Sequence, residues 1–395
     1  MMKRLLLLVG CLVFGHEVPA VTTPSYQEFE KWLEGKHLVT VKGLGGDLSI
    51  SGEVRVEYQK KSEVINNVQQ RGDAGAVPRS PKNNYDVELN LMFNYSTDWS
   101  WANVKIEMDN NAGVFNGTSG RINLERAIFG VKLYKHDVST GSLIFGRRGL
   151  SNVFDSQVEF GSRMDGFLLN VTAAAGFAGD FYLTTGPFLV NERLDQYAYV
   201  GEIGVLNVCN TGVYLKYSLI DWDTKDFNSF QTEHEYLFMN SQMTLGYKFV
   251  SPWIKKFVTL YTAGLLNHRA EGNFLTNGKR ANWAWYAGFS FGEAIKTGDW
   301  SLNINYQEVA AQAIPQFDVG GIGTGNTAGA NFYAASSSRT AFGETNFKGF
   351  MIDLLYLFSN NLTLQQSYNQ SIRLDHSIGP VFRNKQYEME LIYSF

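Results

Sequence analysis

The stretch from Asp47 to Gln59, DLSISGEVRVEYQ, alternates between two kinds of residue without a break. Leucine, isoleucine, valine and tyrosine fall at even positions, and serine, glutamate and arginine fall at odd ones. Such alternation predicts a β-strand with one apolar and one polar face. Soluble strands average about 5–6 residues, whereas a strand that crosses a bilayer at a tilt needs about 9–11. The length therefore favours a membrane-spanning strand whose charged side faces water.

The same two-residue period recurs to the end of the chain. Seven short and eight longer connections alternate between the apolar–polar runs, which is the asymmetry of transmembrane barrels with short periplasmic turns and longer outer loops. We therefore predict an all-β fold, a transmembrane antiparallel β-barrel of about 16 strands over residues 47–395. The expected strands cover or are centred near Asp47–Gln59, Tyr85–Tyr95, Ala102–Asp109, Phe129, Leu143, Leu168, Tyr182, Val200, Leu215, Met243, Leu260, Trp283–Phe291, Trp300–Gln307, Ile352, Leu364 and Met389.

The N-terminus has the pattern of a secretory signal peptide over residues 1–20. Lys3 and Arg4 precede the apolar segment Leu5–Phe14, and Val-Pro-Ala follows as a cleavage site with small residues. The segment is too short to span a membrane. Cys11 also fits a lipoprotein processing site, which is an alternative that the sequence leaves open.

Residues 21–46 form a second N-terminal unit, expected on the periplasmic side. Ser25 and Glu28 form a capping box that predicts a short amphipathic helix, and Gly35 ends it. This helix lies before the period changes to two.

The chain ends in QYEMELIYSF, where every second residue from Tyr387 to Phe395 is hydrophobic. A ladder of this kind with a terminal aromatic resembles the signal by which bacterial outer-membrane barrels are recognised. We therefore expect the barrel-assembly machinery to be a partner through Phe395.

Composition and motifs exclude several other classes of protein. The net charge is −4 without a Lys/Arg-rich run, which argues against a nucleic-acid binder. After signal cleavage Cys209 is the only cysteine, so no intramolecular disulfide can form. His234-Glu235 lacks the second histidine of HExxH, and Gly320–Gly325, GGIGTG, does not open a helix as a phosphate loop would. We expect no enzymatic activity, cofactor or metal.

The third long connection, Arg148–Ser162, is the candidate for a loop folded into the channel. Its residues Val158–Ser162, VEFGS, resemble the Pro-Glu-Phe-Gly-Gly turn in the constriction loop of general diffusion porins at three of five positions, with Val in place of Pro and Ser in place of the last Gly. Asp155 and Glu159 would then form the acidic side of a constriction. The alternatives are an ordinary outer loop and scattered, solvated charges. Candidates for the basic side are Arg55, Lys105, Arg126, Lys132 and Arg147.

Aromatic residues on polar faces suggest a second hypothesis, a channel that recognises sugars by stacking. Tyr214 and Tyr286 fall on the polar faces of their runs, and Trp222 lies near the outer end of one. Aromatic girdles at membrane interfaces also use Tyr and Trp, so the signal is weak.

The C-terminal half carries a resemblance to a known family. GDWSLNINYQEV from Gly298, the glycine-rich IPQFDVGGIGTGN from Ile314 and FKGFMIDLLYLF from Phe347 resemble the outer-membrane porins of chlamydiae, which are sometimes grouped with carbohydrate-selective porins. The likeness covers residues 242–395 well and the rest more loosely. It implies passive diffusion of small hydrophilic solutes across the bacterial outer membrane, contact with its lipid, and a homotrimer. Rival functions are a carbohydrate-selective channel and a structural or adhesive barrel.

Overall fold

The computed structural model describes residues 39–43, 46–72, 81–111, 119–192, 196–222, 238–272, 276–315, 318–322 and 345–395. Two single-turn 3₁₀ helices, η2 (Leu150–Asn152) and η3 (Gly176–Ala178), accompany the strands. In these ranges no helix is both long and apolar enough to cross a membrane. The strands are β1 (Val39–Gly43), β2 (Gly46–Ile65), β3 (Val68–Gln69), β4 (Asn83–Ser96), β5 (Ser100–Asn111), β6 (Ser119–His136), β7 (Ser139–Gly149), β8 (Arg163–Ala174), β9 (Asp180–Asn191), β10 (Gln196–Val208), β11 (Val213–Trp222), β12 (Phe238–Val250), β13 (Phe257–Asn267), β14 (Trp283–Phe291), β15 (Trp300–Val309), β16 (Phe347–Leu357), β17 (Leu362–Arg373) and β18 (Phe382–Ser394).

Sixteen of these strands close into a barrel. From β4 to β18 each strand pairs antiparallel with the next, and β2 completes the ring by pairing with both β4 and β18. The short strands β1 and β3 pair with β2 outside this ring. The predicted antiparallel barrel of about 16 strands is therefore confirmed. The helix expected near Ser25 lies outside the described residues.

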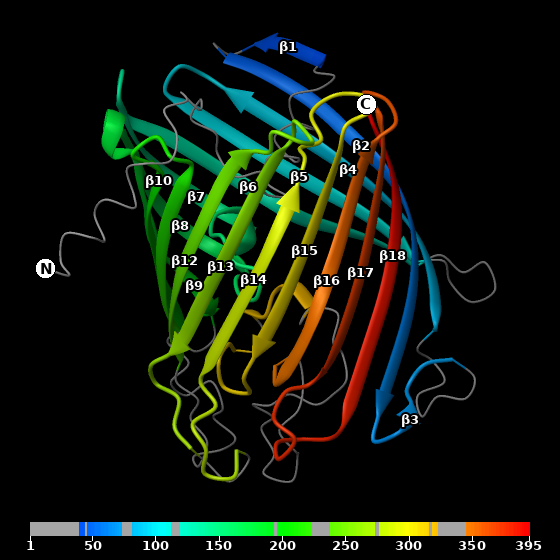
Figure 1. Ribbon diagram of the computed structural model, residues 1–395. Helices are drawn as coiled ribbons and strands as arrows, with labels where there is room; N and C mark the ends of the chain where they lie inside the picture. Colours follow the sequence, from blue (N-terminus) through cyan, green and yellow to red (C-terminus); the bar gives the residue numbers. More distant parts are fainter. Residues whose placement is uncertain are drawn as a thin grey trace, which may run out of the picture.

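The connections separate by length between the two ends of the barrel (Figure 1). The end that holds the C-terminus carries short turns, such as residues 137–138 between β6 and β7. The opposite end carries the long connections, including residues 150–162 after β7 and residues 310–346 after β15. This arrangement matches the alternation of connection lengths expected from the sequence.

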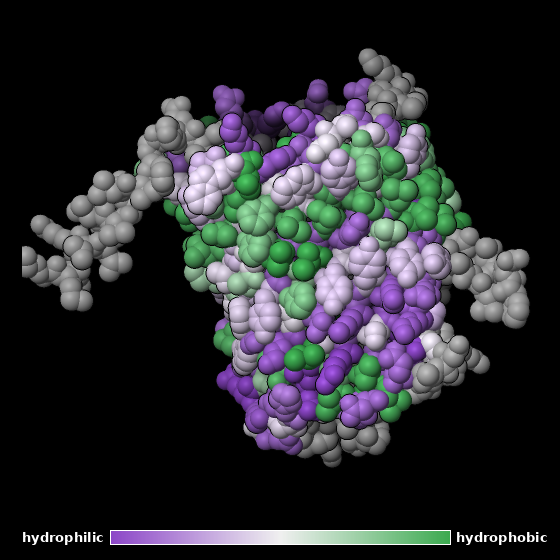
Figure 2. Space-filling model, turned by 45° about the vertical axis from the view of Figure 1, so that its right-hand side comes forward, coloured by the Kyte–Doolittle hydropathy of each residue, from purple (hydrophilic) through white to green (hydrophobic). Residues whose placement is uncertain are grey.

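The two faces of the wall differ as the alternating sequence predicts. Val56 pairs with Leu391 on one side and Val87 on the other, and all three side chains are exposed on the outer surface. One residue along, Glu57 pairs with Glu390 and Asp86 on the inner face. Figure 2 shows hydrophobic side chains gathered over the upper part of the outer wall, below a hydrophilic rim. An exposed apolar band on a closed barrel is typical of membrane-spanning strands.

The last residue of the chain lies at the seam of the barrel. The N–H and carbonyl of Phe395 both bond to Gly52 of β2, each at 2.9 Å. A Cβ atom on Gly52 would lie 2.6 Å from the Phe395 ring, so glycine leaves the space that this ring occupies. The terminal aromatic thus closes the hydrogen-bond ladder between β18 and β2.

A charge introduced on the outer face should lower the free energy of unfolding, whereas the same charge on the inner face should leave it nearly unchanged. Leu91 pairs with Gly52 and Ile106, midway along the outward apolar row Val87–Tyr95 of β4. We expect Leu91→Arg to lower the free energy of unfolding in lipid vesicles by about 2–4 kcal/mol, as for arginine at a bilayer midplane.

The matched control is Gln59→Arg on the inner face, where Gln59 already donates to Glu57 and Glu388. This change should leave the unfolding free energy nearly unchanged. Equal losses for the two variants, measured by urea titration, would contradict the assignment of the faces.

Candidate functional site

Residues 150–162, hereafter the inward loop, fold into the barrel and reach its far wall. The Asp155 carboxylate forms an ion pair with Lys216 of β11 at 2.7 Å. The Ser156 hydroxyl donates to Gln242 of β12 at 2.7 Å, and the Gln157 carbonyl accepts from Gln307 of β15 at 3.0 Å. A connection that leaves β7 and bonds to β11, β12 and β15 must cross the lumen.

Apolar side chains give the inward loop a core of its own against the inner wall. Leu150, Phe154 and Phe160 are almost completely buried, and the Phe154 and Phe160 rings lie 5.1 Å apart. They pack in one cluster with inward residues of the neighbouring strands, including Met164, Leu168, Phe188, Val200, Ile220 and Trp222. Burial of this cluster holds the loop across the channel without help from a disulfide.

The tip of the inward loop carries the two predicted acidic residues. The Glu159 carboxylate is buried and accepts a hydrogen bond from the Asn240 side chain of β12 at 2.5 Å. The Ser156 hydroxyl accepts from the N–H groups of Val158 and Glu159, which closes a tight turn. Asp155 and Glu159 therefore bond to the wall that the loop reaches, and only Asp155 remains partly exposed.

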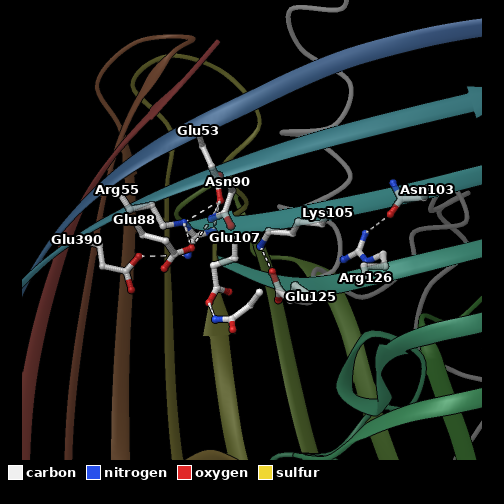
Figure 3. A network of polar contacts seen from close by, with 11 residues as sticks. Glu53, Arg55, Glu88, Asn90, Asn103, Lys105, Glu107, Glu125, Arg126 and Glu390 are labelled. Carbon is white, nitrogen blue, oxygen red and sulfur yellow. Dashed lines mark hydrogen bonds and ion pairs between the residues drawn. The ribbon is translucent and has the colours of Figure 1, made fainter. Parts of the chain in front are cut away.

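Three of the predicted basic residues meet on another part of the inner wall (Figure 3). Arg55 of β2 lies 2.6 Å from Glu53, 3.4 Å from Glu390 and 4.0 Å from Glu88. On the neighbouring strands Lys105 lies 2.6 Å from Glu125, and Arg126 donates to Asn103 at 3.3 Å. The residues of this network come from β2, β4, β5, β6 and β18. Each cation faces acidic or amide neighbours on its own wall.

Two predicted basic residues do not belong to this group. Arg147 lies on the outer face of β7, in line with Phe145, and forms an exposed ion pair with Asp165 of β8 at 2.5 Å. Lys132 donates to the Asp98 carbonyl at 2.8 Å, in the short turn between β4 and β5. Arg147 therefore points away from the lumen, and Lys132 is bonded to a turn at the end with short turns. The inner face of β7 could not be identified from the sequence, because this strand reads Leu-Ile-Phe in its middle.

The three candidate sugar-stacking residues face inward but are covered. Trp222 is 1% exposed and packs edge-to-face against Phe188, with ring centroids 5.3 Å apart. Tyr214 and Tyr286 are 5% and 2% exposed, and Tyr286 packs against Tyr261. Their rings stabilise the wall and the inward loop, so they offer no open face for a sugar.

Alternation in the sequence could have identified one residue of the site that was missed. Lys216 falls at a polar position of β11, between Tyr214 and Ser218, and provides the cation for Asp155. No local signal identifies its partner, since the two lie 61 positions apart. In the described ranges no three His, Cys, Asp or Glu side chains are grouped as metal ligands.

Comparisons with known proteins agree with this architecture. No protein-family model matches the chain, and no curated protein matches it. Pseudomonas putida OprB aligns over 89% of this chain and 94% of its own, with a TM-score of 0.51 and 10% identity. Salmonella typhi OmpF, in complex with daunomycin, and the outer membrane channel DcaP of Acinetobacter baumannii give TM-scores of 0.49 and 0.48, each at 12% identity over 90% of this chain and all of theirs. At such identity, the likeness to OprB establishes the fold.

The ion pair between Lys216 and Asp155 provides a test of how the inward loop is held. Lys216→Met removes the cation from a pair that is only partly buried. We expect a loss of about 1–2 kcal/mol in loop stability, between the values for exposed and buried pairs. Hydrogen exchange of residues 154–160, measured by mass spectrometry in detergent, should be correspondingly faster.

Lys248→Met is the matched control. Lys248 of β12 forms an equally short ion pair with Glu293, 2.7 Å away, at the end with short turns. This variant should leave exchange in the inward loop unchanged. Equal acceleration in both variants would show that Lys216 does not hold the loop.

Proposed function

We propose that the protein is an outer-membrane channel for the passive diffusion of small hydrophilic solutes. The observation that carries this proposal is a polar-lined barrel with one loop folded across its lumen. Sixteen strands enclose a ring wide enough for water to pass. The inward loop narrows this ring and leaves part of the wall lined with charge.

Solvent reaches that charged wall. The side chain of Glu88 is 27% exposed and that of Arg55 is 12% exposed, although both point to the inside of the ring. Arg55 and Asp155 would face passing solutes, whereas Lys105, Arg126 and Glu159 are largely buried. Charges of both signs on the wall favour polar solutes over apolar ones. A polar solute loses hydrogen bonds to water when it enters the channel, and the charged wall can replace them.

The remaining features of the proposal come from the sequence. The signal over residues 1–20 would direct export, and the apolar outer band would place the barrel in lipid. The C-terminal ladder ending at Phe395 would be read by the assembly machinery. A homotrimer and kinship with chlamydial porins are parts of the proposal that the resemblance supports.

The rival functions receive less support from the site. A channel that recognises sugars by stacking needs exposed ring faces, and the rings of Trp222, Tyr214 and Tyr286 are covered. An enzyme needs a set of reactive groups at an accessible position, and the polar groups described on the inner wall are engaged in structural hydrogen bonds and ion pairs. Diffusion requires only the lumen itself.

Recording from planar bilayers tests the proposal. The purified, refolded protein should insert in discrete steps, with a current that is linear in voltage and rises in proportion to salt concentration. Added maltodextrins and monosaccharides should not block it. Saturable block by one sugar would favour a carbohydrate-selective channel, and a protein that inserts without conducting would favour a structural barrel.

A further inference from the structure

Part of a second connection also lies inside the barrel, against the inward loop. This connection joins β15 to β16, and residues 310–315 and 318–322 within it are hereafter the second inward segment. Ile314, Val319 and Ile322 are buried in one cluster with Val158 of the inward loop. The Gln312 carbonyl accepts from Asn267 of β13 at 2.8 Å, which ties the segment to the inner wall.

Asp318 is the residue of this segment that bonds most extensively to the inward loop. Its carboxylate is fully buried and accepts from the Phe160 N–H at 3.3 Å and from the N–H and hydroxyl of Ser162 at 3.2 and 2.5 Å. The Asp318 carbonyl also accepts from the Gly161 N–H at 2.9 Å. One residue thus satisfies three consecutive backbone N–H groups in the middle of the barrel, where unpaired groups would be costly.

The two connections touch too closely for side chains to separate them. A Cβ atom on Gly161 would lie 2.3 Å from the Val319 carbonyl oxygen, and one on Gly321 would lie 2.0 Å from the Gln157 carbonyl oxygen. The Gly320 N–H donates to the Val158 carbonyl at 2.8 Å. Gly320 and Gly321, which begin the glycine-rich run GGIGTG, therefore provide close backbone contact.

Phe160 shows that the turn depends on this contact. Its φ angle is +70°, in the left-handed region that a bulky residue rarely adopts. Such a conformation persists where the surroundings determine it. Here the Asp318 carboxylate accepts the Phe160 N–H and the Phe160 ring is buried against Phe154.

We infer that Asp318 is a positioning residue for the channel, and that the second inward segment forms the constriction together with the inward loop. This inference rests on the proposed function. Asp318 fixes the backbone at residues 160–162, and that backbone fixes where Asp155 and the loop tip lie in the lumen. The width of the channel is therefore set by two connections from different parts of the chain.

The charge state of the contact gives a readout beyond stability. Burial raises the pKa of Asp318 to about 7, against the lowering effect of its bonds from Ser162 and Phe160. Burial and the neighbouring Asp318 charge raise the pKa of Glu159, and the bond from Asn240 of β12 opposes this. The packed state therefore favours the protonated form of Asp318. The stability that this proton gives the contact between the two connections is complete below the ordinary carboxyl pKa, and it is lost as pH rises through about 7.

Single-channel recording of three variants tests the inference. Asp318→Ala leaves buried N–H groups unpaired and should raise the fraction of time spent in altered conductance levels by roughly 5- to 30-fold, the factor for about 1–2 kcal/mol. Asp318→Asn keeps an acceptor without a charge, so its conductance should match the wild type near pH 6 and vary less up to about pH 8. Asp375→Ala is the control, since Asp375 bonds Ser377 and Lys279 in an exposed connection.

The outcomes separate this inference from the proposed function. Wild-type conductance, noise and pH profile in a folded Asp318→Ala barrel would overturn the role of Asp318. If Asp318→Ala does not fold, Ser162→Ala removes one of the same bonds and should give a smaller change in the same direction. If the wild-type protein does not conduct, the proposed function fails. Hydrogen exchange at residues 158–162, faster in Asp318→Ala than in Asp375→Ala, then still tests the contact.

Discussion

Pairing of backbone hydrogen bonds around a closed ring is the constraint on which the rest of this structure depends. In lipid no water is available for unpaired N–H and carbonyl groups, so a sheet must have no free edge. Here β2 pairs with β4 and β18, and the terminal Phe395 bonds to Gly52 at the seam. Once the ring closes, alternation assigns each side chain to lipid or to the lumen.

Closure also determines what the lumen contains. A ring of sixteen strands is too wide for inward side chains to fill it. The lumen also contains parts of two connections, residues 150–162 and the second inward segment, which have their own apolar clusters. The charged wall of β2, β4, β5, β6 and β18 bonds largely within itself, so its cations balance neighbouring carboxylates and do not form a separate basic face opposite Asp155.

The sequence predicts the barrel well because its signal is local and repeated. Two-residue alternation in β2 and β4 defines their faces, and connection lengths define the two ends. The inward loop was a hypothesis from its position as the third long connection and from a match at three of five motif residues. Its anchors could not be predicted because Lys216 and Asp318 are distant in sequence. Arg147 was misplaced since apolar residues occupy both faces of β7. The burial of Trp222 could not be predicted, because alternation indicates the direction of a side chain but not what covers its ring.

The glycine contacts between the two connections have a consequence for sequence change. Gly161 and Gly321 each lie against a carbonyl oxygen of the other connection, so neither segment can gain a side chain there unless the other moves. Homologous barrels should therefore show coordinated replacement of these two stretches. An engineer who transplants a pore loop into this scaffold would have to exchange both stretches together.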